Sequence, residues 1–188
     1  MKTFYIGQIY EKLIFVEENL KKAQSKGIIR SLKTKRINDV LLIHFTIPLI
    51  TVLGTSESYM PIKVYVVDDY IISLSEDIKT AQRIKDIVVN LKPKRLSPKE
   101  VKNILCKCKI ALLYGITINK PKTIYSIDKA IKLLDKVKKW KGWLGFGIYI
   151  RNRYYTIDIY SDGRIALPKV EDEILIELMK HIIDCIKN

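Results

Sequence analysis

The residues best able to do chemistry are two histidines and three cysteines, and their spacing gives no complete catalytic or metal-binding set. His181 and Cys185 are four residues apart in a stretch with helical spacing, which places both on one face of a helix. Cys106 and Cys108 lie in a segment that we expect to be a strand, so both thiols would point to one side. A zinc site would need more His or Cys ligands nearby. We therefore expect no metal and no cofactor.

His44 and the paired acids are expected to have structural roles. His44 lies in a long apolar run and is expected in the core. Asp68-Asp69 suits a turn, and Glu171–Glu173 suits a helix N-terminus, where carboxylates interact favourably with the helix dipole. The chain also has no P-loop, no GxSxG motif and no Rossmann glycine fingerprint. These observations favour a non-enzymatic protein.

Cations interleaved with aromatic residues are the stronger chemical signal. The chain of 188 residues has a formal net charge of +14, and an excess of Lys and Arg favours a polyanionic partner such as nucleic acid. Residues 93–188 contain 20 basic and 10 acidic residues, whereas residues 1–92 contain 14 and 10. The alternative explanation of the charge is a solvated surface of the kind found in thermophiles.

Two segments of the second half combine the two residue types: 136–143, which reads KVKKWKGW, and 149–155, which reads YIRNRYY. Lys and Arg contact phosphates, and aromatic rings stack on bases. The candidate nucleic-acid-binding residues in these segments are Lys138, Lys139, Lys141, Trp143, Tyr149, Arg151 and Arg153. A core position for Trp140 or Trp143 is the structural alternative.

The elements that must position these residues end in a hairpin and a helix over 154–188. Apolar and polar residues alternate from Tyr155 to Ser161, which predicts a half-buried strand. Asp162-Gly163 predicts a tight turn, because Gly tolerates the positive φ of a primed turn. Apolar residues from Leu175 to Ile186 then follow helical spacing.

The rest of the chain also predicts strands and helices. Ser97 and Ser126 are expected to cap helices, the first within a capping box with Pro98 at the first helical position. The other expected elements are strands over 3–15, 40–53, 106–119 and 142–152, helices over 17–26 and 77–91, a basic loop over 30–36 and a hairpin over 62–74.

The hairpin and helix occur twice. A shift of 93 residues places Ile62–Leu74 on Tyr155–Leu167 with both turns in register, and a shift of 95 superposes the following helices. We therefore predict an α+β fold of two tandem repeats, 1–92 and 93–188. The repeats would form one curved antiparallel sheet with helices on one face.

This repeated unit resembles the TATA-binding protein family, a saddle of two tandem copies. Tyr160-Ser161-Asp162-Gly163-Arg164, followed by an apolar strand, is similar to the signature hairpin of that family, with Arg for Lys and an added Asp. Trp143, seventeen residues before Tyr160, matches the position of a second aromatic residue. The resemblance implies that Trp143 and Tyr160 lie together at one end of the saddle and contact bases, with Arg164 beside them. Inserted side chains of this kind kink the duplex.

The first half departs from the family pattern. The positions equivalent to Trp143 and Tyr160 are Ile50 and Val67, which are apolar without being aromatic. We include both as candidate contacts, because inserted wedges need not be aromatic.

The expected function is nucleic-acid binding, with duplex DNA as the partner, on the concave sheet face and in a transcription-related role. A transcription factor or another protein would be a further partner. The alternatives are an interaction scaffold that lost DNA binding and an RNA-processing enzyme on two ferredoxin-like halves, for which His44 is the catalytic candidate. The uncharged run 40–56 falls short of the roughly 20 residues of a membrane span. With three cysteines and no signal peptide, the chain is expected in the cytoplasm.

Overall fold

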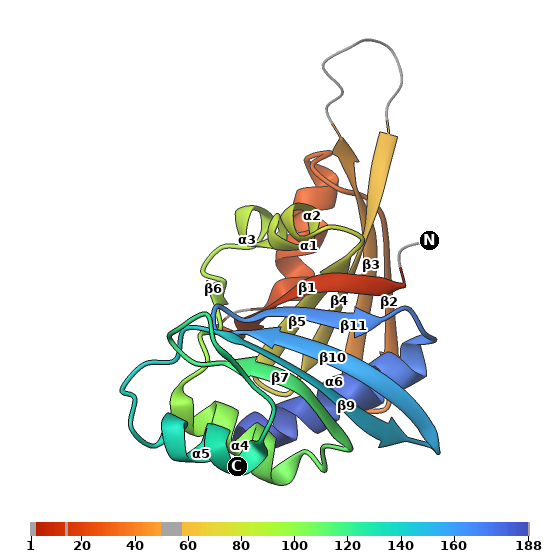
Figure 1. Cartoon of the computed structure of the whole chain (residues 1–188). Coiled ribbons are helices and arrows are strands. Elements are labelled where there is room, and N and C mark those ends of the chain that lie inside the picture. Colours follow the sequence, from red (N-terminus) through yellow and green to blue (C-terminus); the bar gives the residue numbers. More distant parts are fainter. Residues whose placement is uncertain (1–2, 14, 50–57, 188) are drawn as a thin grey trace. The chain divides into compact units, whose positions relative to one another are not determined.

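The computed structural model describes residues 3–13, 15–49 and 58–187, which form helices and antiparallel strands (Figure 1). The predicted α+β class is confirmed. The chain divides into two compact units, described here one at a time: an N-terminal unit, Phe4–Pro93, and a C-terminal unit, Lys94–Asn188 together with Thr3. In the described ranges, no helix is long and apolar enough to cross a membrane.

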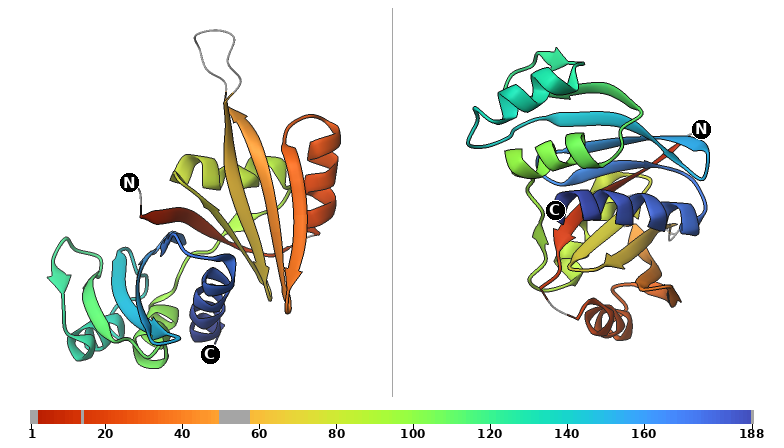
Figure 2. Two further views of the ribbon diagram at one scale, coloured as in Figure 1. Left: turned by 90° about the vertical axis from the view of Figure 1, so that its right-hand side faces the viewer. Right: turned by 90° about the horizontal axis from the view of Figure 1, so that it is seen from below.

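The N-terminal unit is an antiparallel sheet in the order β2–β3–β4–β5–β1, with the short β6 also paired to β1. Its elements are β1 (Phe4–Glu11), α1 (Val16–Ser25), β2 (Arg30–Ile37), β3 (Val40–Leu49), β4 (Ser58–Val67), β5 (Tyr70–Ser75), α2 (Ile78–Gln82), α3 (Ile84–Ile87) and β6 (Lys92–Pro93). The predicted hairpin over 62–74 is confirmed as β4–β5, joined at Asp68-Asp69. Leu20 of α1 and Ile84 of α3 share one buried cluster with Phe45 of β3, so both helices cover the same sheet face (Figure 2).

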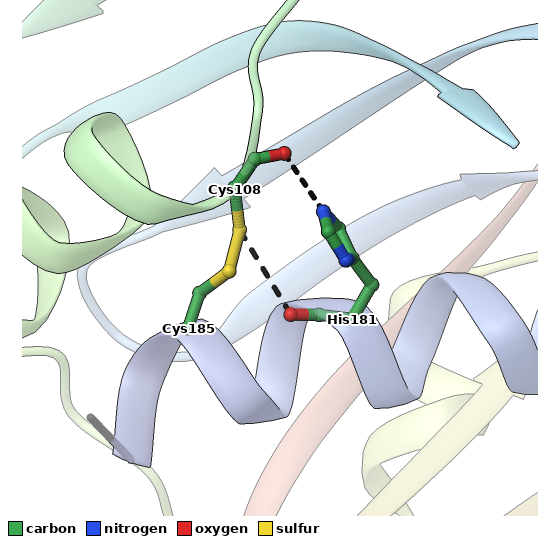
Figure 3. The surroundings of a disulfide bond; sticks show 3 residues. All are labelled: Cys108, His181 and Cys185. Atoms are coloured by element: carbon green, nitrogen blue, oxygen red, sulfur yellow. Dashed lines mark hydrogen bonds between the residues drawn. A yellow bond between two sulfur atoms is a disulfide. The ribbon is translucent and has the colours of Figure 1, made fainter.

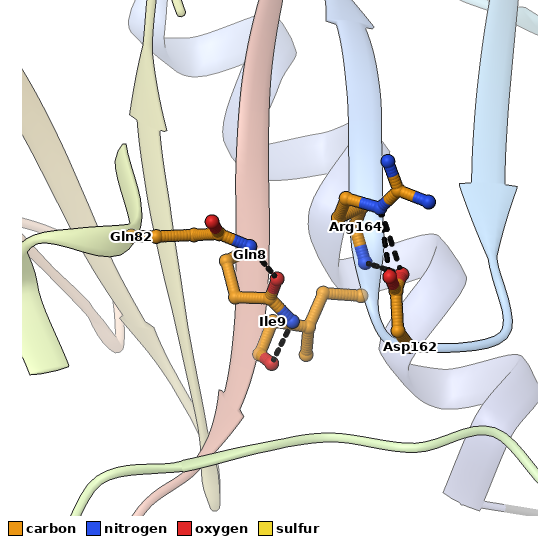
Figure 4. Close-up of polar contacts among 5 residues, drawn as sticks. All are labelled: Gln8, Ile9, Gln82, Asp162 and Arg164. Carbon is orange, nitrogen blue, oxygen red and sulfur yellow. Dashed lines mark hydrogen bonds and ion pairs between the residues drawn. The ribbon is translucent and has the colours of Figure 1, made fainter. Parts of the chain in front are cut away.

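The predicted helix over 77–91 is broken into α2 and α3 by hydrogen bonds from the sheet. The Ser73 hydroxyl donates to the carbonyl of Ala81 at 2.6 Å, and the Tyr10 hydroxyl donates to that of Gln82 at 3.2 Å. A continuous helix would use these carbonyls for its own amides four residues on. The Gln82 side chain also donates to the buried Gln8, which fixes α2 on β1 (Figure 4).

The basic segment 30–36 is a strand, so the prediction of a loop is wrong. It forms β2 at the edge of the sheet, paired with β3, and nearly all of its side chains are exposed. Lysines on an edge strand discourage pairing with a second chain. Because charged residues occupy most positions of β2, the segment has no alternation of apolar and polar residues that would predict a strand.

The strands of the C-terminal unit pair antiparallel in the order β11–β10–β9–β7–β8. Its elements are α4 (Pro98–Lys107), β7 (Leu112–Thr117), β8 (Thr123–Ile124), α5 (Ile127–Leu134), β9 (Trp143–Ile150), β10 (Arg153–Tyr160), β11 (Arg164–Pro168) and α6 (Asp172–Lys187). Figures 1 and 2 show α4 and α6 side by side on one face of this sheet. Leu144, Phe146 and Ile159 are fully buried on that face, as are Leu175 and Met179 of α6.

Local signals predicted in this half are present. Ser97 caps α4 in a full capping box with Glu100, and Pro98 is at the start of the helix. The Ser126 hydroxyl accepts from the Lys129 amide at the start of α5. The predicted hairpin is present as β10–β11, but its connection has three residues, 161–163, and is not the predicted two-residue primed turn. The Gly163 amide donates to the Tyr160 carbonyl at 2.9 Å, and Gly163 takes the positive φ of +83° at the last position of the turn. The order of three strands and a helix is the same in β3–β4–β5–α2 and in β9–β10–β11–α6.

The prediction that Cys106 and Cys108 lie in a strand is wrong. Cys106 lies in helix α4, and only Leu112–Thr117 of the expected strand 106–119 is strand, because the capping box at Ser97 begins a helix that runs to Lys107. Cys106 is free and exposed, whereas Cys108 is bonded to Cys185 of α6.

Candidate nucleic-acid interface

The face of the C-terminal sheet opposite α4 and α6 carries aromatic rings and glycines. Side chains alternate between the faces of a strand, so Trp143, Gly145, Gly147 and Tyr149 of β9 share this face. Their direct partners on β10 are Tyr160, Asp158, Thr156 and Tyr154. Together with Tyr114 and Gly115 of β7, these residues are called the aromatic–glycine face.

The glycines leave room for rings that lie down on the sheet. A Cβ atom on Gly145 would collide with the indole ring of Trp143, and one on Gly147 would collide with the ring of Tyr154. The indole ring also reaches Gly115, where an added Cβ atom would be 3.2 Å from its Cζ3. Any larger residue at these positions would displace the rings, so the glycines let the rings of Trp143 and Tyr154 lie close to the backbone of the sheet.

Trp143 and Tyr160 lie directly opposite each other at one end of this face. Both are half-buried. Arg164 of β11 places its guanidinium carbon 4.6 Å from the centre of the Tyr160 ring, and its Nε donates to Asp162 at 2.8 Å (Figure 4). A guanidinium held over an aromatic ring is itself a planar stacking surface.

Three tyrosines form the other end of the face. The rings of Tyr149 and Tyr154 are 5.3 Å apart in a T-shaped arrangement, and the Tyr154 hydroxyl donates to that of Tyr114 at 2.7 Å. Desolvation and the contact with Tyr114 raise the pKa of Tyr154 to about 12, so it remains a neutral donor at physiological pH. Tyr149 is six residues from Trp143 along β9, a separation of roughly 20 Å at about 3.3 Å per residue.

Asp158 puts one carboxylate near the middle of the face. Burial raises the pKa of its carboxyl above the ordinary value, and a hydrogen bond with Trp143 opposes this shift. Burial likewise raises the pKa of the Tyr160 hydroxyl, with Asp158 adding to the shift and Arg164 opposing it. A carboxylate here repels phosphate but can accept hydrogen bonds from base amino groups. The centre of the face is therefore better suited to bases than to a phosphate backbone.

A cationic pocket of about 390 Å³ adjoins the Trp143–Tyr160 end. Its lining includes four cationic residues and one acidic residue, together with two serines: Arg95, Lys138, Lys139, Lys141, Asp162, Ser97 and Ser161. We call it the basic pocket. Ser161 follows Tyr160, and its amide donates to the carbonyl of Gly142, which precedes Trp143, at 3.0 Å. The pocket and the face thus meet at the same backbone contact.

Hydrogen bonds to its backbone groups, and not ion pairs of its lysines, hold the loop that carries Lys138, Lys139 and Lys141. The side-chain amide of Asn119 donates to the carbonyl of Lys139 at 2.7 Å and accepts from the amide of Lys141 at 2.6 Å. Trp140 is buried, and its indole N–H donates to the carbonyl of Thr117, so Trp140 serves the core. The exposed lysine side chains are left to face the pocket.

The two predicted arginines lie elsewhere. Arg151 and Arg153 line a separate pocket with Tyr155 and Glu171, on the helix-covered side of the sheet. Arg151 is also ion-paired with Glu177 of α6. The sequence places these arginines among tyrosines, but alternation along β10 directs Arg153 away from the aromatic–glycine face, and Arg151 lies in the turn between β9 and β10.

The remaining predicted residues belong to the N-terminal half. Val67 is buried at the end of β4. Ile50 lies outside the described residues. His44 is half-buried on β3, directly opposite Lys33 of β2 and Lys63 of β4.

A second cleft lies at the β8 edge of the same unit. It measures about 740 Å³ between β8 and α5, its walls are mainly apolar, and Lys120, Lys122 and Lys129 stand among its lining residues. Tyr125, which is 70% exposed, lines this cleft, and its ring is 3.6 Å from the place of a Cβ atom on Gly115. The cleft therefore continues the aromatic–glycine face toward β8.

Sequence reasoning missed Tyr114, Asp158 and Arg95. The period-two run WLGFGIYI from Trp143 to Ile150 contains the signal for the glycine positions, since every second residue shares a face. Tyr114 carries no such signal, because β7 shifts its register between Leu113 and Gly115.

Comparison of the chain with protein-family models, with curated proteins and with solved structures gives no match. The chemistry of the aromatic–glycine face and the basic pocket is therefore the basis for assigning a function.

Proposed function

We propose that the protein binds nucleic acid through its C-terminal unit, with DNA as the partner. Bases lie on the aromatic–glycine face and phosphates occupy the basic pocket. The observation that carries this proposal is the position of two half-buried rings, Trp143 and Tyr160, next to a pocket with four cationic side chains.

The chemistry of the two parts is complementary. Stacking on an aromatic ring contributes about 1–3 kcal/mol per base and tolerates any sequence. Lysine and arginine contacts to phosphate add affinity that falls with salt. Asp158 disfavours a phosphate over the centre of the face, so the backbone is expected to follow the edge with the lysines.

The saddle and the tandem repeat are part of the same proposal. The common order of three strands and a helix in the two units supports a duplication, and the Trp143–Tyr160 pair supports the resemblance to the TATA-binding protein family. Under this proposal the C-terminal unit makes most of the contacts, and a transcription-related role follows from the resemblance.

The test is fluorescence anisotropy with labelled duplex DNA, single-stranded DNA and RNA of one sequence, measured across a salt series. Trp143→Ala and Tyr160→Ala should each weaken binding by about 5–150-fold, the equivalent of about 1–3 kcal/mol. The matched control is Phe15→Ala, which removes a 76%-exposed ring from the N-terminal unit and should leave affinity unchanged.

The outcomes separate the candidate functions. Absence of binding to all three probes at low salt would overturn the proposal in favour of a protein-interaction scaffold. Cleavage of the RNA probe without metal would instead favour an RNA-processing enzyme, and His44→Ala would then be the first variant to examine.

A further inference from the structure

We propose that Cys108, His181 and Cys185 form a binding site for a thiophilic divalent metal such as Zn²⁺ when the cysteines are reduced. The site is independent of the nucleic-acid interface, since it lies where α4 ends against α6. The two sulfur atoms and a ring nitrogen of His181 all lie within 4.8 Å of one another (Figure 3). Among the described residues, these three form the cluster of potential metal ligands.

The distances suit a single ion. Zinc binds sulfur at about 2.3 Å and imidazole nitrogen at about 2.0–2.1 Å, and tetrahedral geometry separates two sulfur ligands by roughly 3.8 Å. The Cα atoms of Cys108 and Cys185 are 5.8 Å apart, so rotation of the two side chains provides this separation without moving the helices. Two Cys and one His leave a fourth position for water, a donor set that zinc accepts.

The histidine is already oriented by the protein. A ring nitrogen, Nε2, lies 2.7 Å from the carbonyl oxygen of Cys108 (Figure 3). Metal-binding histidines commonly donate one ring N–H to a backbone carbonyl, which fixes the tautomer and directs the other nitrogen to the metal. Here one ligand residue orients another.

The electrostatics of the two helices favour a cation. Cys108 is the C-cap residue of α4, and Cys185 lies in the last turn of α6. Helix C-termini carry a partial negative charge that stabilises cations nearby. Both cysteines are buried while His181 is half-buried, so solvent can reach the site from the histidine side.

The structure holds the two cysteines as a disulfide, which excludes the metal, so loading follows reduction. A low-molecular-weight dithiol supplies two electrons and two protons to the sulfur–sulfur bond and leaves as its own disulfide. The metal then replaces the two thiol protons, which pass to solvent. Oxidation and metal binding are thus alternative states of the same two sulfurs.

The test uses the full chain, reduced with a dithiol, freed of reductant without oxygen and titrated with Co²⁺ and then Zn²⁺. We expect one Co²⁺ per chain with sulfur-to-cobalt charge-transfer absorption, which Zn²⁺ displaces. His181→Gln, which keeps both sulfurs, should lower affinity at least 10-fold. Cys106→Ser, which removes the exposed free thiol of α4, should change nothing.

Cys108→Ser and Cys185→Ser should each abolish the charge-transfer band, with circular dichroism used to confirm that the variants fold. The proposal is overturned if the reduced, folded parent takes up no cobalt, or if Cys106→Ser removes the band. It is equally overturned if the dithiol cannot free the two thiols without unfolding the chain.

Discussion

The indole ring of Trp143 occupies the space that a Cβ atom on Gly145 would fill, two residues along the same strand. Gly145→Ala should therefore lift the ring from the sheet. The lifted ring would lose its position beside Tyr160, and we expect nucleic-acid affinity to fall about 10-fold, within the range of one lost stacking contact. Trp143 fluorescence should shift toward the red as the ring becomes more exposed. Phe15→Ala, which removes an exposed ring of the N-terminal unit, is the control and should leave both measurements unchanged.

Ser97 is expected to matter for stability and not for binding, although it lines the basic pocket. Its hydroxyl accepts from the amide of Glu100, and the Glu100 carboxylate accepts from the amide of Ser97. Ser97→Ala removes one half of this capping box and should lower the free energy of unfolding by about 1 kcal/mol. Ser97→Thr retains the hydroxyl and should cost less, as measured by urea unfolding. An unchanged midpoint for Ser97→Ala would show that the cap contributes nothing.

Local signals in the sequence predicted much of the fold. Alternation and turn chemistry gave the β4–β5 and β10–β11 hairpins, and side-chain caps gave the starts of α4 and α5. These features depend on residues close in sequence. The break between α2 and α3 does not, because it depends on hydroxyls of Tyr10 and Ser73 that the sheet brings to the helix.

The candidate site was predicted only in part, because some of its features depend on residues close in sequence and others on contacts between distant segments. Seventeen residues separate Trp143 from Tyr160, yet the hairpin register makes them direct neighbours. The sequence around Arg151 and Arg153 suggested that both belong to the site, but both lie on the helix-covered side of the sheet. The turn between β9 and β10 determines which residues face each side, and this cannot be read from composition. The meeting of Cys108 with Cys185 across 77 residues has no local signal at all.

The basic pocket predicts a specific salt dependence. Lys138, Lys139 and Lys141 are exposed, and their loop is held by backbone bonds to Asn119, so changing all three to Gln should leave the fold intact. Each lost phosphate contact lowers the slope of log affinity against log salt by about 0.9 for duplex DNA. The triple variant should therefore reduce the slope by about 2–3, as measured by anisotropy.

A matched control separates phosphate contacts from net charge. Lys22, Lys26 and Lys85 are exposed lysines of the N-terminal unit, and changing them to Gln alters the net charge by the same amount. The slope of log affinity against log salt for this control variant should equal that of the parent. Equal slopes for the two triple variants would show that the general positive charge, and not the basic pocket, provides the affinity.

Asp158 predicts how stability depends on pH. Burial raises the pKa of its carboxyl in the folded state, opposed by the hydrogen bond with Trp143, whereas the unfolded chain should titrate near about 3.9. Between these two pKa values the folded state holds a proton that the unfolded state has lost. The free energy of unfolding therefore falls as pH rises through this interval. Above the folded pKa, the loss of stability due to Asp158 is constant. Below the unfolded pKa both states are protonated and Asp158 adds no pH dependence.

Asp158→Asn removes this titration and keeps an oxygen that can accept from Trp143. Its stability relative to the parent should increase as pH rises from about 3.9 and level off above the folded pKa. Urea unfolding of both proteins from about pH 3 to about pH 8 measures the difference, in which the other carboxylates cancel. Asp158→Ala lacks the acceptor, so it should show the same pH dependence with a constant offset toward lower stability, because the Trp143 N–H loses its partner. A difference between parent and Asn variant that does not vary with pH would mean that the folded environment leaves this carboxyl unchanged.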